Sequence, residues 1–77
     1  MNAAKAYEVV NAGLALVGQA PITAPSDGTD RQKIEFLFNT YVARLKRAVP
    51  EYRKLKDDRL IPDMGVAYLV SVLDGKK

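Results

Sequence analysis

Glycine and proline divide this 77-residue chain into segments that are each apolar at the spacing of an α-helix. The first break comes at Gly18 and Pro21, the second at Pro50 and the third at Pro62. Glycine readily takes the left-handed conformation that ends helices, and proline cannot continue one. No two stretches read as a pair of strands, so the sequence predicts an all-α fold.

The first segment predicts a helix over residues 3–17. Its apolar side chains recur every three or four residues and lie on one stripe: Ala3, Tyr7, Val10, Leu14 and Val17. Gly18 can end this helix, and Pro21 prevents its continuation. Residues 20–28 are expected to form a loop.

The second segment predicts a helix over residues 30–49. Thr29 and Gln32 have the Thr-x-x-Gln spacing of a capping box, in which each side chain bonds the other residue's backbone amide. A core-facing stripe follows: Ile34, Leu37, Phe38, Tyr41, Leu45, Ala48 and Val49. The two helices are expected to pack as an αα-hairpin.

The remainder predicts two shorter helices. Residues 51–58 are expected to restart as a short helix with Pro50 at its first position, turning Tyr52 and Leu55 inward. Asp63 can cap a final helix over residues 64–73. Val66, Leu69, Val70 and Leu73 match helical spacing, whereas Val66, Tyr68, Val70 and Val72 alternate as in a strand. The helix is favoured because no partner strand is evident.

The predicted architecture is one domain, residues 1–77: a small helical bundle built on the N-terminal αα-hairpin, with a shorter C-terminal helical segment. A chain this short buries only about 60% of its unfolded surface. At about 0.05 to 0.15 kcal/mol per residue, its stability is expected to lie near 4 to 11 kcal/mol. There is no cysteine, so no disulfide can supplement the core, and an intracellular, reducing setting fits best.

The chain carries no recognisable machinery for catalysis. It has no histidine or cysteine, and no nucleophile elbow, phosphate-binding loop or dinucleotide fingerprint. Residues 27–30 superficially resemble a calcium loop, but the alternating oxygen ligands and the closing glutamate are missing. We therefore expect no enzyme activity, cofactor or metal. No apolar run approaches the roughly 20 residues of a membrane span, and residues 3–17 lack the features of a secretory signal.

The first helix is apolar on a second side, which carries Val9, Ala12, Gly13 and Leu16. The C-terminal segment could cover this side, or it could be a subunit interface. On the second helix, Phe36 projects away from the core stripe and shares its face with Thr40, Ala43 and Arg47. Phe36 is either an isolated solvated side chain, which is the favoured explanation, or the anchor of an interface. The candidate interface residues are Val9, Ala12, Leu16, Phe36 and Ala43.

Basic residues gather between positions 44 and 59, where seven stand against three acids. The candidates for contact with DNA phosphates or with an acidic partner are Arg44, Lys46, Arg47, Arg53, Lys54 and Lys56. Lysine and arginine bind phosphates by displacing counterions, without base recognition. A solvated face with ion pairs such as Lys54 with Asp58 is the favoured explanation of the stretch. No base-reading motif stands out, so a nucleic-acid function would be non-sequence-specific.

Two runs resemble a known family. Residues 10–22 read Val-Asn-Ala-Gly-Leu-Ala-Leu-Val-Gly-Gln-Ala-Pro-Ile, and residues 41–50 read Tyr-Val-Ala-Arg-Leu-Lys-Arg-Ala-Val-Pro. An apolar helix ending in Gly-x-x-Pro-Ile, followed by a longer helix with an aromatic-x-x-Arg pattern that stops at proline, resembles the head-to-tail adaptor proteins of tailed bacteriophages, also called connector, tail tubular or gatekeeper proteins. The resemblance covers about two-thirds of the chain.

The resemblance implies a structural role in virion assembly. Copies of such a protein form a ring between the portal and the tail and extend the DNA channel. The implied partners are other copies of the chain, the portal protein, tail proteins and the DNA backbone in the channel, with no membrane. The implied location is the head–tail junction of the virion, after assembly in the host cytoplasm. Two alternatives remain: a small nucleic-acid-binding helical module, and a regulator that binds one host protein through its first helix.

Overall fold

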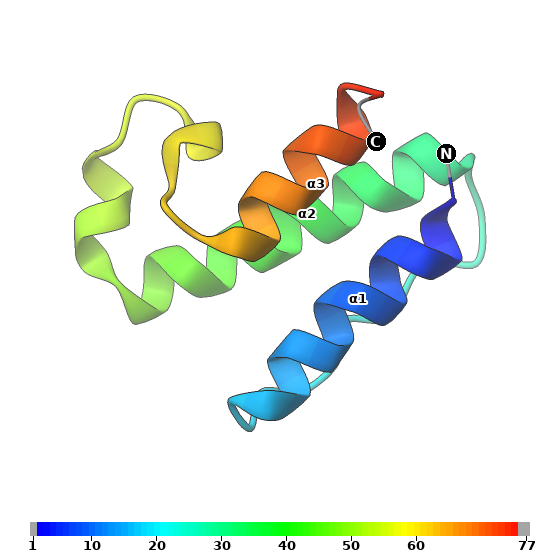
Figure 1. Cartoon of the computed structure of the whole chain (residues 1–77), viewed down its shortest axis with the longest axis horizontal. Coiled ribbons are helices and arrows are strands. Elements are labelled where there is room, and N and C mark those ends of the chain that lie inside the picture. Colours follow the sequence, from blue (N-terminus) through cyan, green and yellow to red (C-terminus); the bar gives the residue numbers. More distant parts are fainter. Residues whose placement is uncertain (1, 76–77) are drawn as a thin grey trace.

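Three α-helices and two short 3₁₀ helices make up the chain in a computed structural model that describes residues 2–75 (Figure 1). The α-helices are α1 (Ala3–Leu16), α2 (Asp30–Ala48) and α3 (Met64–Leu73), and the 3₁₀ helices are η1 (Pro50–Lys54) and η2 (Asp58–Leu60). No strand occurs between residues 2 and 75. The predicted all-α fold is confirmed, and the ambiguous C-terminal segment is helical.

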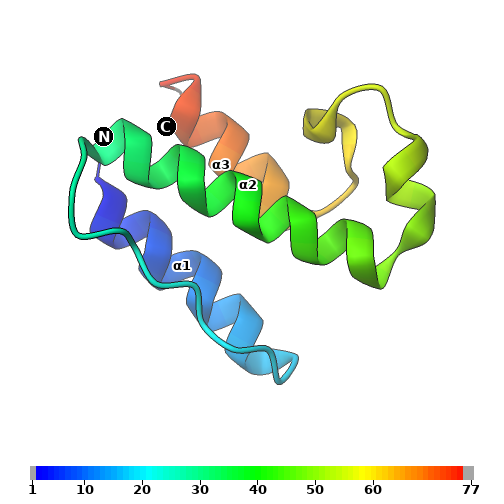
Figure 2. The same ribbon diagram turned by 180° about the vertical axis from the view of Figure 1, so that it is seen from behind.

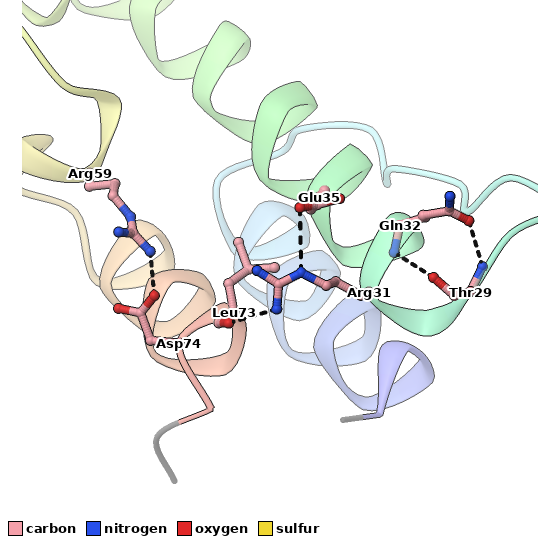
Figure 3. A network of polar contacts seen from close by, with 7 residues as sticks. All are labelled: Thr29, Arg31, Gln32, Glu35, Arg59, Leu73 and Asp74. Carbon is pink, nitrogen blue, oxygen red and sulfur yellow. Dashed lines mark hydrogen bonds and ion pairs between the residues drawn. The ribbon is translucent and has the colours of Figure 1, made fainter.

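Polar caps begin the three α-helices. The Asn2 side chain accepts from the Lys5 amide at the start of α1. Thr29 and Gln32 form the expected capping box at the start of α2, where Thr29 Oγ1 accepts from the Gln32 amide and Gln32 Oε1 accepts from the Thr29 amide (Figure 3). Asp63 caps α3. These bonds satisfy amides that have no partner within a helix.

α1 and α2 lie side by side and begin at the same end of the molecule. The Ala3 amide donates to Asp30 Oδ2 at 3.3 Å, and the Tyr7 hydroxyl donates to the Lys33 carbonyl at 2.6 Å. The connecting loop runs back along α1 (Figure 2), so the two helices point in the same general direction and diverge toward their C-terminal ends. The predicted contact between the two helices is therefore present, but their antiparallel αα-hairpin arrangement is not, because that arrangement needs a short connection.

α3 packs along α2 in the opposite direction. The guanidinium of Arg31, in the first turn of α2, donates to the carbonyl of Leu73 at the end of α3 (3.0 Å) and pairs with Glu35 (Figure 3). The two termini therefore lie at one end of the long axis, and η1 with the turn that follows it forms the other end (Figure 1).

The loop between α1 and α2 is tied to both helices. The Asn11 side-chain amide donates to the Ile22 carbonyl at 3.0 Å, and the Ile22 amide donates back to Asn11 Oδ1 at 2.8 Å. Ile22 itself is buried in the core. The loop also contacts the second half of α2, where the Arg44 guanidinium donates to the Ala20 carbonyl. We call residues 19–24 the strap, because these bonds join the end of α1 to the second half of α2.

The core has two parts. The larger joins all three α-helices and includes the fully buried Ile34, Leu37 and Leu69; the smaller is made of Val42, Ile61 and Val66. Phe38 and Tyr41 pack against both parts. Val42 lies outside the stripe predicted for α2. That stripe describes one contact face of α2, and residues 61–66, which lead into α3, cover a second face that includes Val42.

Three further sequence expectations are corrected. Val17 is 71% exposed rather than in the core, because it follows the end of α1 where that helix has diverged from α2. Ala48, the last residue of α2, is also exposed, because α1 has diverged from this end of α2. Residues 51–58 do not form one helix, since η1 ends at Lys54 and η2 begins at Asp58. An extended Leu55 separates them, and this backbone lets Leu55 pack against the smaller core cluster.

Candidate functional site

An apolar groove of about 910 Å³ opens where α1 diverges from α2. The α1 wall contains Val9, Gly13 and Val17, which follow one another at intervals of four residues and so lie along one line of the helix. The other walls come from the second half of α2 and the start of α3, chiefly Tyr41, Leu45, Ala48, Met64 and Tyr68. We call this feature the α1–α2 groove.

The charged side chains that line the groove already have partners within the chain. Arg44 donates to the Ala20 carbonyl. Asp63 Oδ1 accepts from the Tyr41 hydroxyl at 2.8 Å and from the Gly65 and Val66 amides at 2.8 and 3.2 Å. Burial, together with the hydrogen bond to the nearby Asp63 carboxylate, raises the pKa of Tyr41 above its ordinary value. The groove therefore presents apolar surface without a free charge.

Most of the large exposed apolar side chains of residues 2–75 lie in or beside this groove. The exposed fractions are 90% for Met64, 88% for Leu16, 71% for Val17 and 39% for Val9. Only two further large apolar side chains in this part of the chain are exposed, Phe36 and Leu60. α3 closes one side of the groove but leaves Val9 and Leu16 open, so the C-terminal segment does not cover the second side of α1.

The predicted interface residues fall on two surfaces. Val9 lines the groove, and Ala12 and Leu16 are exposed on the adjoining edge of α1. Phe36 is 45% exposed and Ala43 is also exposed, and both lie on α2 far from its core-facing side. The structure thus brings three of the five candidates together and places the other two elsewhere.

Contacts within the chain occupy half of the basic candidates. Arg44 bonds the strap, Lys46 pairs with Asp58, and Arg53 Nε donates to the Lys46 carbonyl at 3.0 Å. Arg47, Lys54 and Lys56 have no such partner within the described range. The pair expected between Lys54 and Asp58 was wrong, because the chain turns after η1 and brings Asp58 to Lys46 instead.

Arg59, the last residue of the basic stretch, is also engaged. It forms an ion pair and hydrogen bond with Asp74 just after α3 (Figure 3). Four of the seven basic residues are therefore bonded within the chain. Lys46, Arg53 and Arg59 hold the irregular segment after α2 in place, and Arg44 holds the strap. This favours a structural reading of the stretch over a continuous phosphate-binding surface.

Within residues 2–75, no group of three or more potential metal ligands comes together. The helices of this part of the chain are also too short or too polar to cross a bilayer. Met64, which lines the groove, and the strap residues Ala20 and Ile22, which join the strap to the helices, were not predicted from the sequence. Asn11 carried a signal, since it is the one polar side chain in the second half of α1.

Comparison of the chain with protein-family profiles, with characterised proteins and with solved structures finds no match. The candidate functional surfaces of residues 2–75 are the α1–α2 groove, the exposed edge of α1 and the outer face of α2.

Proposed function

We propose that this chain is a structural subunit of the head-to-tail connector of a tailed bacteriophage. In this proposal, copies of the chain form a ring between the portal protein and the tail and extend the DNA channel. The ring lies at the head–tail junction of the virion, and it assembles in the host cytoplasm. The chain performs no catalysis and needs no cofactor.

The observation that carries the proposal is the uncovered second half of α1. Leu16 is 88% exposed and Val17 is 71% exposed, beside an apolar groove that the chain does not fill. Monomeric proteins rarely expose contiguous apolar surface of this kind, and larger patches mark contact with another macromolecule. The resemblance of residues 10–22 and 41–50 to head-to-tail adaptors supplies the class of assembly.

DNA contact has a limited place in this proposal. Of the six basic candidates, Arg47, Lys54 and Lys56 are available to phosphates, since the other three are bonded within residues 2–75. A ring multiplies a weak contact by the number of copies. An independent nucleic-acid-binding module would need measurable DNA affinity as a single chain at low salt, and its absence would remove that alternative.

The proposal is tested by mixing the purified chain with the portal protein of the same phage and measuring the masses of the complexes by size-exclusion chromatography with light scattering. We expect the chain to elute with the portal. Leu16→Glu is expected to weaken this binding by about tenfold or more, because it places a charge on the exposed apolar edge. Ala15→Glu adds the same charge to another exposed position of α1 and is expected to bind normally.

The connector proposal fails if the chain never joins the portal, whether it remains a strict monomer or associates with itself. It also fails as an assignment to α1 if Leu16→Glu and Ala15→Glu bind the portal equally well.

A further inference from the structure

The outer face of α2 carries an uncharged ridge with one large apolar side chain, Phe36. At 100° per residue, five residues fall within an arc of about 100° on the side of α2 away from α1 and α3. These residues are Gln32, Phe36, Asn39, Thr40 and Ala43, and we call them the Phe36 ridge. All are exposed except Thr40, which is half-buried. No charged residue interrupts this face until Arg47, one turn beyond Ala43, in a chain of which 27% is charged.

Gly13 gives the α1–α2 groove room for another backbone. A Cβ built at Gly13 meets no atom within 4 Å, so nothing inside the chain requires glycine here. Glycine within a helix lowers its stability relative to alanine. A glycine on the wall of an open groove allows the close approach of a second helix, and the neighbouring Val9 and Val17 would pack on either side of it.

The ridge and the groove match in length and in charge. From Val9 to Val17 the α1 wall spans about 12 Å, and from Phe36 to Ala43 the ridge spans about 10 Å at 1.5 Å per residue. The two charged groups in the groove are bonded within the chain, so a charged occupant would lose hydration without gaining a partner. An uncharged ridge with one large aromatic side chain avoids the burial of an unpaired charge.

The ridge cannot enter the groove of its own molecule. α2 forms one wall of the groove and also carries the ridge on its outer side, so only another copy can make the contact. Each copy then has one groove and one ridge on different sides of α2. Such a contact is heterologous, and its repetition gives a ring or a filament.

We propose that the Phe36 ridge of one copy docks in the α1–α2 groove of the next. This inference rests on the proposed function only in that copies of the chain associate, and it identifies the two surfaces that meet.

Two kinds of variant separate the surfaces. Gly13→Leu fills the groove from a position where the added side chain meets nothing in the folded chain. Met64→Glu places a charge in the groove at a side chain that is 90% exposed, and so provides a second groove variant with little effect on folding. Phe36→Glu disrupts the ridge. Ala15→Leu and Ala15→Glu are matched controls, because Ala15 is exposed on α1 and lines neither surface.

Sedimentation of the full chain over a range of concentrations measures association, with circular dichroism to verify folding. We expect the wild-type chain and both Ala15 variants to form species larger than dimers. Gly13→Leu, Met64→Glu and Phe36→Glu are each expected to remain folded monomers, with association at least about tenfold weaker.

Mixing a groove variant with the ridge variant is the decisive step. Gly13→Leu keeps its ridge and Phe36→Glu keeps its groove, so an equimolar mixture is expected to form a dimer with one copy of each and nothing larger. The proposal is overturned if the mixture remains monomeric, if the wild-type chain does not associate, or if the groove and ridge variants assemble like the wild type. A chain that associates in this way but never joins the portal would refute the connector alone. A chain that joins the portal only as single copies would refute this inference alone.

Discussion

Gly65 lies where the ring of Tyr41 crosses the first turn of α3. A Cβ built at Gly65 would be 2.7 Å from Tyr41 Oη and 2.8 Å from its Cε2. These atoms belong to a ring fixed by its hydrogen bond to Asp63 and by packing against both core clusters, so they cannot easily move. The glycine is therefore required by a close approach between α2 and α3.

The first prediction compares two glycines within helices. We expect Gly65→Ala to lower the free energy of unfolding by about 1 to 3 kcal/mol, because the methyl group overpacks the contact with Tyr41. Gly13→Ala is the matched control, and we expect it to raise stability by up to about 1 kcal/mol, since its methyl group meets no other atom. Urea unfolding measures both. Equal effects at the two sites would contradict the close approach at Gly65.

The second prediction concerns stability in alkali. The pKa of Tyr41 is raised by burial, with a smaller effect of the Asp63 carboxylate, above the usual value of 10.0, and burial also raises the pKa of Tyr7. The folded chain thus keeps these phenol protons to higher pH than the unfolded chain does. Their contribution to stability is complete below about pH 10 and is lost progressively as the pH rises above it, through the folded pKa.

Tyr41→Phe tests this dependence. We expect the variant to be less stable at neutral pH by about 1 kcal/mol, because the hydrogen bond to Asp63 is lost. Its unfolding free energy should also decline less steeply above about pH 10, with Tyr7 accounting for part of the remaining slope. Denaturant unfolding between about pH 8 and pH 11 provides the comparison. Parallel curves for the two proteins would argue against a raised pKa at Tyr41.

At the scale of elements, the helix caps differ in how many helices each one joins. Thr29 caps α2 at an exposed site within its own turn. Asp63 caps α3 and also accepts from Tyr41 on α2, so one carboxylate oxygen both begins a helix and joins two helices.

The third prediction follows from this difference. We expect Thr29→Ala to lower the unfolding free energy by about 1 kcal/mol. Asp63→Ala should lower it by about 2 to 3 kcal/mol, because it removes the cap and leaves the half-buried Tyr41 hydroxyl without a partner. Thermal and urea unfolding of both variants give the ranking. The reverse order would mean that the bond between Asp63 and Tyr41 contributes little.

The elements themselves were predictable because their signals are local. Capping residues, apolar spacing and the breaks at Gly18 and Pro50 act within a few residues, and they placed α1, α2 and α3 closely. The direction of α2 relative to α1 was not local. It depends on the bonds between Asn11 and Ile22 and between Arg44 and Ala20, which no periodicity indicates.

At the scale of the whole molecule, the core is small and its fully buried side chains are few. Ile34, Leu37, Val66 and Leu69 are the largest of them among the described residues. Because so few large side chains are fully buried, the loss of one of them removes a large share of the stability of the fold. The exposed apolar side chains contribute almost nothing to the stability of a single copy.

The fourth prediction contrasts two leucines. Leu37→Ala is expected to lower the unfolding free energy by about 2 to 5 kcal/mol, a large share of the stability of a 77-residue chain. Leu16→Lys is expected to change it by less than about 0.5 kcal/mol, because Leu16 is 88% exposed. Urea unfolding at low protein concentration measures the difference. A large effect at Leu16 would indicate that the single chain does bury that side chain.

The groove was only partly predictable from the sequence. The second apolar side of α1 was evident, since Val9 and Leu16 have no place on the core stripe. The sequence did not indicate that this side of α1 stays uncovered, because its exposure depends on how far α1 diverges from α2 and on where α3 lies. Met64 follows directly after the cap of α3 and carries no pattern that would place it beside α1.

The strap has an evolutionary consequence. It sets the angle between α1 and α2 through bonds from the Asn11 and Arg44 side chains to its backbone groups, and Ile22 is its one buried core residue. Loops accept insertions and deletions more readily than helices do. A lineage could therefore widen or narrow the groove by changing the length of residues 19–28, and so acquire a different neighbour while keeping every core residue.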